Sequence, residues 1–203
     1  FSSRRRHTRF RNVTGVQTCA LPIFEGQPIG HLPIHRRAKM GLSYLPQENS
    51  VFRQLTVEEN ILAVLQLNAS VQRKAQEQQL EHLLGELQIE HLRRQPAIAL
   101  SGGERRRVEI ARALATSPRF VLLDEPFAGV DPIAVIEIQR IVSFLRERRI
   151  GVLITDHNVR ETLGICDRAY ILNDGKVLAD GKPSALIANE QVRKVYLGEN
   201  FKM

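Results

Sequence analysis

The sequence has no tryptophan, only two cysteines and few aromatic residues of any kind. Cys19 and Cys166 lie far apart in the chain and form no ligand-like pair with the scattered histidines, so the sequence indicates neither a disulfide framework nor a zinc site. No apolar run approaches the roughly eighteen residues that a membrane-spanning helix requires. The arginine-rich start also lacks the continuous apolar stretch of a signal peptide. We therefore expect a cytoplasmic protein.

Acidic residues are absent from residues 1–23, which contain five arginines. The whole chain has a net charge of +7, with 29 basic and 22 acidic residues; removing these five arginines leaves 24 basic residues, a net charge of +2. The string at residues 1–9 resembles translated sequencing-adapter read-through. We expect residues 1–23 to be a non-native or disordered basic appendage, and the alternative is an arm that binds phosphate backbones or anionic lipid.

The sequence also lacks a phosphate-binding P-loop, which requires Gly-x-x-x-x-Gly-Lys followed by Ser or Thr. The nearest stretch runs from Gly175 to Gly181-Lys182-Pro183, with the wrong spacing and a proline where the hydroxyl residue belongs.

What the sequence does contain is concentrated between Leu100 and Pro132. The apolar run from Phe120 to Leu123 predicts a strand buried on both faces, and Asp124 and Glu125 follow where that strand should end. Ligands of parallel sheets bind outside the carboxyl ends of the strands. Asp124 could hold Mg²⁺ through water, while Glu125 orients or deprotonates a water that attacks phosphorus. A solvated acidic turn is the alternative.

Ser101-Gly102-Gly103 precedes a segment whose apolar residues keep helical spacing. Backbone N–H groups at the positive start of such a helix form an anion site. Ser101 and Glu104 also match a capping box, which needs no ligand, and both interpretations can hold together.

The motifs together resemble those of ABC-type ATPases. Leu100-Ser-Gly-Gly-Glu104 resembles the signature motif, the strand ending at Asp124-Glu125 resembles Walker B, and Gly129-Val-Asp-Pro132 resembles the D-loop. Gln47 resembles the Q-loop residue and His157 the switch histidine. The resemblance spans roughly residues 24–203. It implies a P-loop NTPase-like (RecA-like) α/β fold with a parallel sheet, incomplete at the N-terminus, and an α-helical subdomain inserted at about residues 50–100.

The resemblance also implies a substrate and site residues. ATP and Mg²⁺ would bind, with Glu125 polarising the attacking water, His157 contacting the γ-phosphate, and Asp124 and Gln47 managing metal and water. Ser101, Gly102, Gly103 and Glu104 would close over nucleotide held by a second copy. Asp131 would reach across that dimer, although Asp131-Pro132 also reads as a helix N-cap followed by proline. Alone, a loop glutamine or a histidine at a strand end is usually incidental.

Further elements can be predicted from the sequence. Thr56 to Glu59 reads as a capping box that starts a helix. A second amphipathic helix is expected over residues 71–94, and Asn173-Asp174-Gly175 is expected to join a hairpin. The resemblance implies that the helical subdomain and the Q-loop receive a coupling helix from a membrane subunit.

Four stretches narrow the resemblance to ATPase subunits of bacterial lipopolysaccharide export transporters: residues 105–115, 127–132, 155–162 and 195–199. This implies two copies beneath membrane permease subunits, on the cytoplasmic face of the inner membrane, with no nucleic-acid partner. The alternatives are the ATPase of a branched-chain amino-acid importer, a soluble ABC-type ATPase acting on nucleic acid, and a non-catalytic binding module. Without a P-loop, we expect this chain to be inactive on its own.

Overall fold

The computed structural model describes residues 22–67, 72–129 and 132–197. They belong to two compact units, residues 1–40 and 41–203. In the first unit, the antiparallel strands β1 (Ile23–Phe24) and β2 (Gln27–Pro28) precede helix α2 (Ile34–Lys39). Most of the expected appendage lies outside the described residues, so the boundary at residue 23 stays a prediction.

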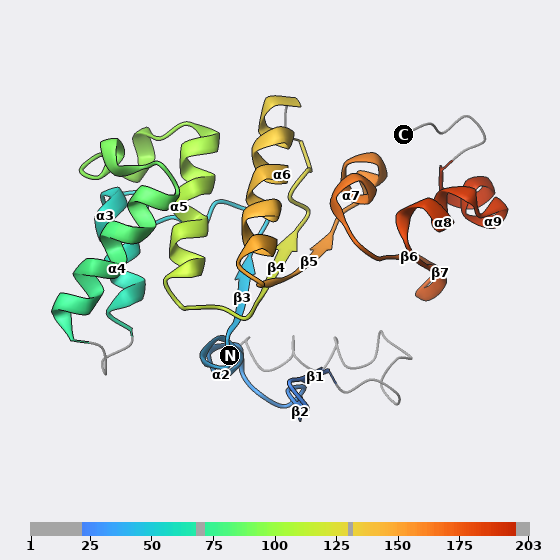
Figure 1. Cartoon of the computed structure of the whole chain (residues 1–203), viewed down its shortest axis with the longest axis horizontal. Coiled ribbons are helices and arrows are strands. Elements are labelled where there is room, and N and C mark those ends of the chain that lie inside the picture. The colour runs from blue at the N-terminus through green and yellow to red at the C-terminus, as the bar shows by residue number, and fades with distance from the viewer. Residues whose placement is uncertain (1–21, 68–71, 130–131, 198–203) are drawn as a thin grey trace, which may run out of the picture. The chain divides into compact units, whose positions relative to one another are not determined.

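The second unit is built on a parallel sheet, as expected (Figure 1). In the order β3-β4-β5, its strands are β3 (Leu42–Leu45), β4 (Phe120–Asp124) and β5 (Gly151–Thr155). Helix α6 (Pro132–Glu147) connects β4 to β5 and starts at the proline that the sequence predicts as the first helical residue. Because crossover helices make neighbouring strands parallel, the acidic end of β4 lies beside the end of β5.

The sheet is buried on one face only. Val121 and Leu123 of β4 pack into the main core with α5 (Gly102–Leu114) and α6. On the other face, Tyr44 is 48% exposed and Leu153 is 45% exposed, in register with the half-buried Leu122. The expectation that β4 is buried on both faces is therefore wrong, because the core helices of the described part of the chain cover only the face of Val121 and Leu123.

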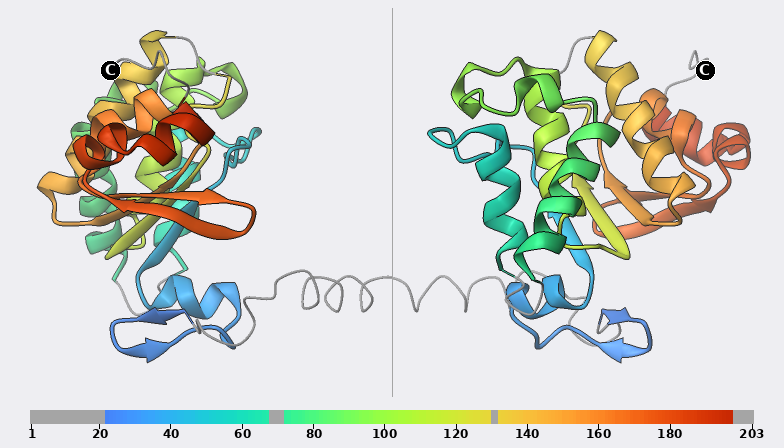
Figure 2. Two further views of the ribbon diagram at one scale, coloured as in Figure 1. Left: turned by 90° about the vertical axis from the view of Figure 1, so that its right-hand side faces the viewer. Right: turned by 60° about the vertical axis from the view of Figure 1, so that its left-hand side comes forward.

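A helical segment lies between β3 and β4. It comprises α3 (Val57–Leu65), α4 (Arg73–Glu86) and two short 3₁₀ turns, η1 (Glu90–Leu92) and η2 (Ala97–Ala99). Figure 2 shows α3, α4 and α5 side by side. The predicted capping box at Thr56 and Glu59 starts α3. These helices belong to the same compact unit as the sheet, so their status as a separate subdomain stays a prediction.

The predicted helix over residues 71–94 is too long. Helix α4 ends at Glu86, because Gln88 takes a left-handed φ of 55° and the Ile89 amide turns back to donate to the Leu84 carbonyl at 3.0 Å. Such a reversal ends a helix by satisfying one of its last carbonyls. Residue 71 lies outside the described residues.

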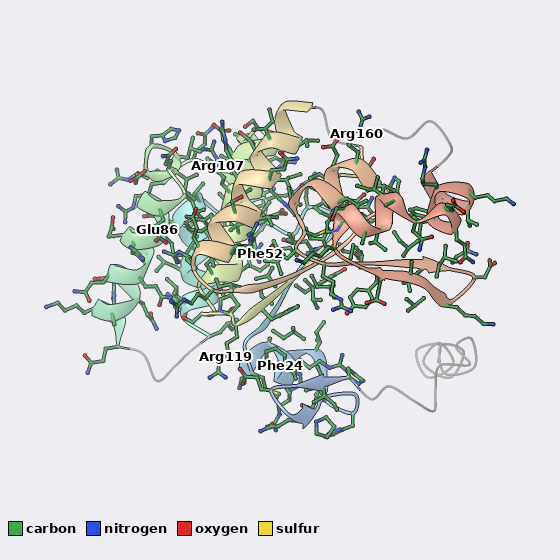
Figure 3. All side chains as sticks on the ribbon, turned by 45° about the vertical axis from the view of Figure 1, so that its right-hand side comes forward. Phe24, Phe52, Glu86, Arg107, Arg119 and Arg160 are labelled. Carbon is green, nitrogen blue, oxygen red and sulfur yellow. The ribbon has the colours of Figure 1, made fainter. Side chains whose placement is uncertain are left out.

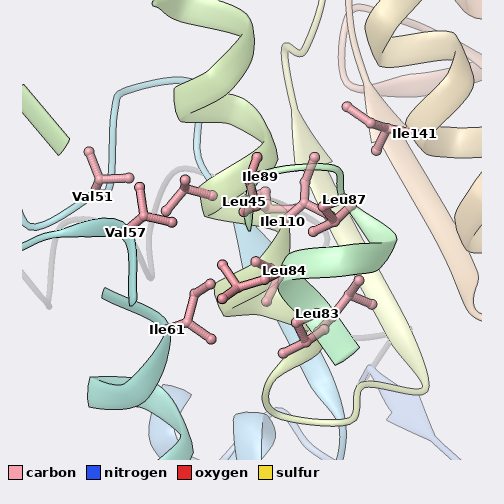
Figure 4. Close-up of a cluster of buried hydrophobic side chains, with 14 of the residues drawn as sticks. Leu45, Val51, Val57, Ile61, Leu83, Leu84, Leu87, Ile89, Ile110 and Ile141 are labelled. Atoms are coloured by element: carbon pink, nitrogen blue, oxygen red, sulfur yellow. The ribbon is translucent and has the colours of Figure 1, made fainter. Parts of the chain in front are cut away.

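The main core joins the helical segment to the sheet (Figure 4). Leu84 and Ile61 are fully buried, and burying each contributes about 1.5–3 kcal/mol. Buried Asn60 accepts from the Phe52 amide at 2.8 Å and donates to three backbone carbonyls of residues 52–56, so it fixes the loop before α3.

An ion pair links α4 to the residue that follows α6. The carboxylate of Glu86, which Figure 3 labels, contacts the Arg148 guanidinium. Its Oε1 also lies 3.2 Å from His82 Nε2. No helix in the described ranges is both long and apolar enough to span a membrane.

The hairpin predicted in the C-terminal part forms. Helix α7 (Val159–Ile165) leads to the hairpin of β6 (Ala169–Asn173) and β7 (Lys176–Gly181). Asp174 and Gly175 both have positive φ, as a two-residue turn of this type requires. The described chain ends with α8 (Pro183–Ala188), α9 (Glu190–Val192) and the π-helical turn η3 (Arg193–Leu197).

Candidate functional site

A groove of about 660 Å³ brings together several of the predicted site residues. Its walls include Gln47 after β3, residues 101–104 at the start of α5, Glu125 after β4, and Glu137 of α6. Asp124 and His157 are not part of its lining, although His157 lies near Glu125. Asp131 lies outside the described residues.

The start of α5 is capped as predicted. The Ser101 hydroxyl accepts from the Glu104 amide at 3.4 Å and donates to the Glu104 carboxylate at 2.7 Å. The Ser101 amide donates to the same carboxylate at 2.8 Å. These bonds to the Ser101 side chain and backbone lower the pKa of Glu104. Glu104 is therefore part of the cap, and the Gly102 and Gly103 backbone lines the groove.

Gly103 has a close neighbour that sequence reasoning missed. A Cβ at Gly103 would lie 2.2 Å from Glu137 Oε2, so the side chain of Glu137 lies against the first turn of α5. A carboxylate is favourable near the positive end of a helix. No local pattern distinguishes Glu137 from other charged residues of α6.

Asp124 ends β4 between two hydroxyl groups. Thr155 Oγ1 donates to its Oδ1 at 2.7 Å, and the Tyr44 hydroxyl donates to its Oδ2 at 2.9 Å. Both bonds lower the pKa of Asp124, and the bond from Thr155 is the larger cause. The bond to Asp124 in turn raises the pKa of Tyr44. Sequence reasoning missed both partners, although the end of a neighbouring strand was the place to look for Thr155.

Glu125 has a strained backbone. Its φ is 43°, in the left-handed region that non-glycine residues rarely adopt, and its amide donates to the Thr155 carbonyl at 2.7 Å. Strain of this kind gathers at functional sites. The side chain is 42% exposed, and its Oε2 lies 3.7 Å from His157 Nδ1, a distance too long for a hydrogen bond but short enough for both groups to approach one ligand.

The described residues contain no group of three or more His, Cys, Asp or Glu side chains that could hold a metal ion. Mg²⁺, however, usually takes most of its ligands from water and substrate phosphates and needs only one or two carboxylates. Each oxygen of Asp124 accepts one hydrogen bond and keeps a second lone pair. The donor set therefore fits an ion that Asp124 holds through water, and does not fit a protein cage.

Comparison with known families matches most of the chain. The sequence model of the family described as ABC transporter matches residues 20–128, more than half of the chain. A second model, described as Branched-chain amino acid ATP-binding cassette transporter, matches residues 176–202.

Individual relatives are similar over longer stretches. An uncharacterized ABC transporter ATP-binding protein of Rhizobium meliloti is 56% identical over 203 residues, covering 97% of this chain and 73% of the relative. The lipopolysaccharide export system ATP-binding protein LptB of Escherichia coli is 54% identical over 198 residues, covering 97% of this chain and 82% of the relative. LptB of Acidithiobacillus ferridurans is 63% identical over 172 residues, covering 85% and 71%.

Solved structures have the same fold. The protein cbiO1 of Clostridium perfringens, part of the ABC transporter complex cbiONQ, aligns with a TM-score of 0.75 at 27% identity. The alignment covers 96% of this chain and 79% of cbiO1. The ADP conformation of an ATP-binding cassette of an ABC transporter aligns with a TM-score of 0.73 at 27% identity, covering 87% and 76%. The order of motifs, the parallel sheet and these similarities agree, and the chain belongs to the family of ABC transporter ATPases.

Proposed function

We propose that this chain is the ATP-hydrolysing subunit of an ABC transporter that exports lipopolysaccharide. For the chemistry, the observation that carries the proposal is the strained Glu125, which directly follows the central strand β4 and has His157 Nδ1 3.7 Å from its carboxylate. For the cargo, support comes from relatives 54–63% identical to this chain that are named for lipopolysaccharide export.

Glu125 acts as the general base in this proposal. Its carboxylate takes a proton from water as the water oxygen attacks the γ-phosphorus of ATP, and the bond to the β–γ bridging oxygen breaks to give ADP and phosphate. General-base catalysis typically accelerates a reaction about 10²–10⁴-fold. His157, 67% exposed beside Glu125, donates a hydrogen bond to the γ-phosphate and holds it in line with that water.

Asp124 and Gln47 would hold Mg²⁺, which neutralises charge on the phosphates when bound. The Thr155 and Tyr44 hydroxyls orient the Asp124 carboxylate and favour its ionised form, and its remaining lone pairs would be available to water bound to the metal. Gln47 lies exposed in the loop after β3 and offers an amide oxygen that can approach or leave as that loop moves.

The signature residues act on a second copy of the chain. Ser101, Gly102 and Gly103 present the start of α5 at an open groove, where nucleotide held by the partner subunit would complete the anion site. We propose that Asp131 links the two sites across this dimer. We propose that permease subunits contact the helical segment between β3 and β4, and that the protein lies on the cytoplasmic face of the inner membrane.

One observation favours a second cargo. Residues 176–202 match the branched-chain amino-acid transporter model. The similarity to export ATPases extends over 198 residues, so we propose lipopolysaccharide as the cargo. Co-purification from the native cell with membrane subunits of a lipopolysaccharide exporter would support this choice, and co-purification with an amino-acid permease would contradict it.

The catalytic proposal is tested by ATP hydrolysis. Residues 24–203 alone should bind and hydrolyse ATP weakly or not at all, because their sequence contains no P-loop. The same residues joined to an N-terminal segment that carries a P-loop should turn over ATP. Robust hydrolysis by residues 24–203 alone would contradict the proposed need for a P-loop, and no hydrolysis by the joined protein would contradict the ATPase mechanism.

A further inference from the structure

The buried carboxylate of Asp156 joins the two segments that carry Glu125 and His157. The Asp156 side chain has no exposed surface. Its Oδ2 accepts from the Phe127 amide at 2.8 Å, and its Oδ1 accepts from the Asn158 amide at 2.7 Å and from Asn158 Nδ2 at 2.9 Å. Three N–H groups therefore surround one carboxylate at the end of β5.

The bond to Phe127 connects residues that are 29 positions apart in the chain. The loop after β4 is thereby attached to the end of β5 at two points, by the Glu125 amide to the Thr155 carbonyl and by the Phe127 amide to Asp156. Glu125 lies in the loop held at these two points, and His157 directly follows Asp156. The same carboxylate therefore constrains both groups that face the proposed γ-phosphate position.

A carboxylate suits this position better than an amide. Burying a charged group is costly unless hydrogen bonds compensate it, and here three donors do so. An asparagine could still accept the Asn158 bonds with its oxygen, but its NH₂ group would then face the Phe127 N–H, two donors without an acceptor. Asp156→Asn should therefore remove the bond to the Glu125 loop and keep the local bonds at the start of α7, so that the two effects can be measured apart.

We infer that Asp156 is a positioning residue that sets the separation of Glu125 and His157. Its effect on turnover rests on the proposed ATPase function, whereas its effect on the geometry does not. The alternative is that Asp156 only orders the start of α7 through Asn158, which would leave the Glu125 loop independent of it.

Amide hydrogen exchange of the 203-residue chain tests the geometric part. In Asp156→Asn, the Phe127 amide should exchange about 10- to 100-fold faster, as expected for a lost hydrogen bond to a charged group, and the Asn158 amide should change much less. Asp167→Asn is the matched control, because Asp167 is 80% exposed and contacts Arg146 at the surface. Unchanged Phe127 exchange in Asp156→Asn would overturn the inference.

A second measurement needs no variant. A through-hydrogen-bond NMR coupling between the Phe127 amide nitrogen and the Asp156 carboxyl carbon should be detectable in the unsubstituted chain. If Asp156→Asn does not fold, this coupling decides the geometric part, and its absence would overturn the inference.

Turnover tests the role in catalysis. In the protein joined to a P-loop segment, Asp156→Asn should lower kcat about 100-fold, since misplacing reacting groups by about 1 Å can cost that much, with KM for ATP nearly unchanged. Unchanged kcat together with faster exchange of the Phe127 amide would overturn the role of Asp156 in catalysis. If the unsubstituted joined protein hydrolyses no ATP, the proposed function fails, while the exchange and coupling results still decide the geometry.

Discussion

At the scale of single residues, the carboxylates were predictable and their partners were not. Asp124 and Glu125 follow an apolar run, so their place at a strand end could be predicted from the sequence. Tyr44 and Thr155 reach Asp124 from two other strands, and only the register of the sheet brings them there. Asp156 has no sequence signal, because its partner Phe127 lies in a distant loop.

The hydroxyl partners of Asp124 predict an order of effects on its pKa. Thr155→Val should raise the pKa of Asp124 more than Tyr44→Phe does, because the Thr155 bond is the larger cause of the lowering. NMR titration of the Asp124 carboxyl carbon measures both. Thr116→Val is the control, since Thr116 donates to the Ala113 carbonyl. No change in Thr155→Val, or a larger change in Tyr44→Phe, would contradict the assignment.

The sign of the pH dependence follows from the same shift. The pKa of Asp124 is lower in the folded protein than its ordinary value of about 4. The ionised group therefore stabilises the folded state above that ordinary value, and this contribution is lost as the pH falls through the lowered one. In Thr155→Val, the acid loss of stability attributable to Asp124 should become smaller, as measured by urea unfolding at several pH values.

At the scale of elements, the sequence predicted starts of helices better than ends. Both capping boxes form as expected, because Ser or Thr followed three residues later by Glu is a local signal. Helix α4 ends early because Gln88 takes a left-handed backbone conformation. The sequence has no glycine or proline at this position that would have predicted the end of the helix. The expectation that the second face of β4 is buried was wrong, because an apolar run contains no information on what covers each face of a strand.

The two capping boxes offer a matched pair. Ser101→Ala and Thr56→Ala should each lower the free energy of unfolding by about 1 kcal/mol, the usual cost of losing an N-cap. Only Ser101→Ala should also weaken ATP-dependent dimer formation by the joined protein, because Ser101 lines the groove and Thr56 does not. Chemical denaturation and light scattering with ATP measure the two effects, and equal dimer formation by both variants would contradict the role of Ser101.

Packing between β4 and β5 makes a further prediction. A Cβ at Gly151 would lie 2.3 Å from the Phe120 ring, its partner in the register, so Gly151→Ala should destabilise the fold by about 1–3 kcal/mol through overpacking. Gly164→Ala in α7 is the control, because its Cβ would meet open space. Thermal unfolding compares them, and an equal melting temperature for the two variants would show that the ring moves aside without cost.

At the scale of the whole molecule, the order of motifs was the strongest source of information. The resemblance led to the ABC transporter ATPases, which the family comparison confirmed. Composition and periodicity alone reach only a phosphate-handling α/β domain, since they do not reveal a cargo or a partner. The groove beside α5 also could not be predicted, because residues 47, 101–104, 125 and 137 meet there only after folding.

Hydrolysis by Glu125→Gln tests the central claim most directly. In the protein joined to a P-loop segment, this variant should still bind ATP and form closed dimers, because the amide keeps the size of the side chain. Its turnover should fall about 10²–10⁴-fold, because the amide cannot accept the proton of the attacking water. Single-turnover ATP hydrolysis with a parallel binding assay measures both quantities. Unchanged turnover in Glu125→Gln would contradict the account.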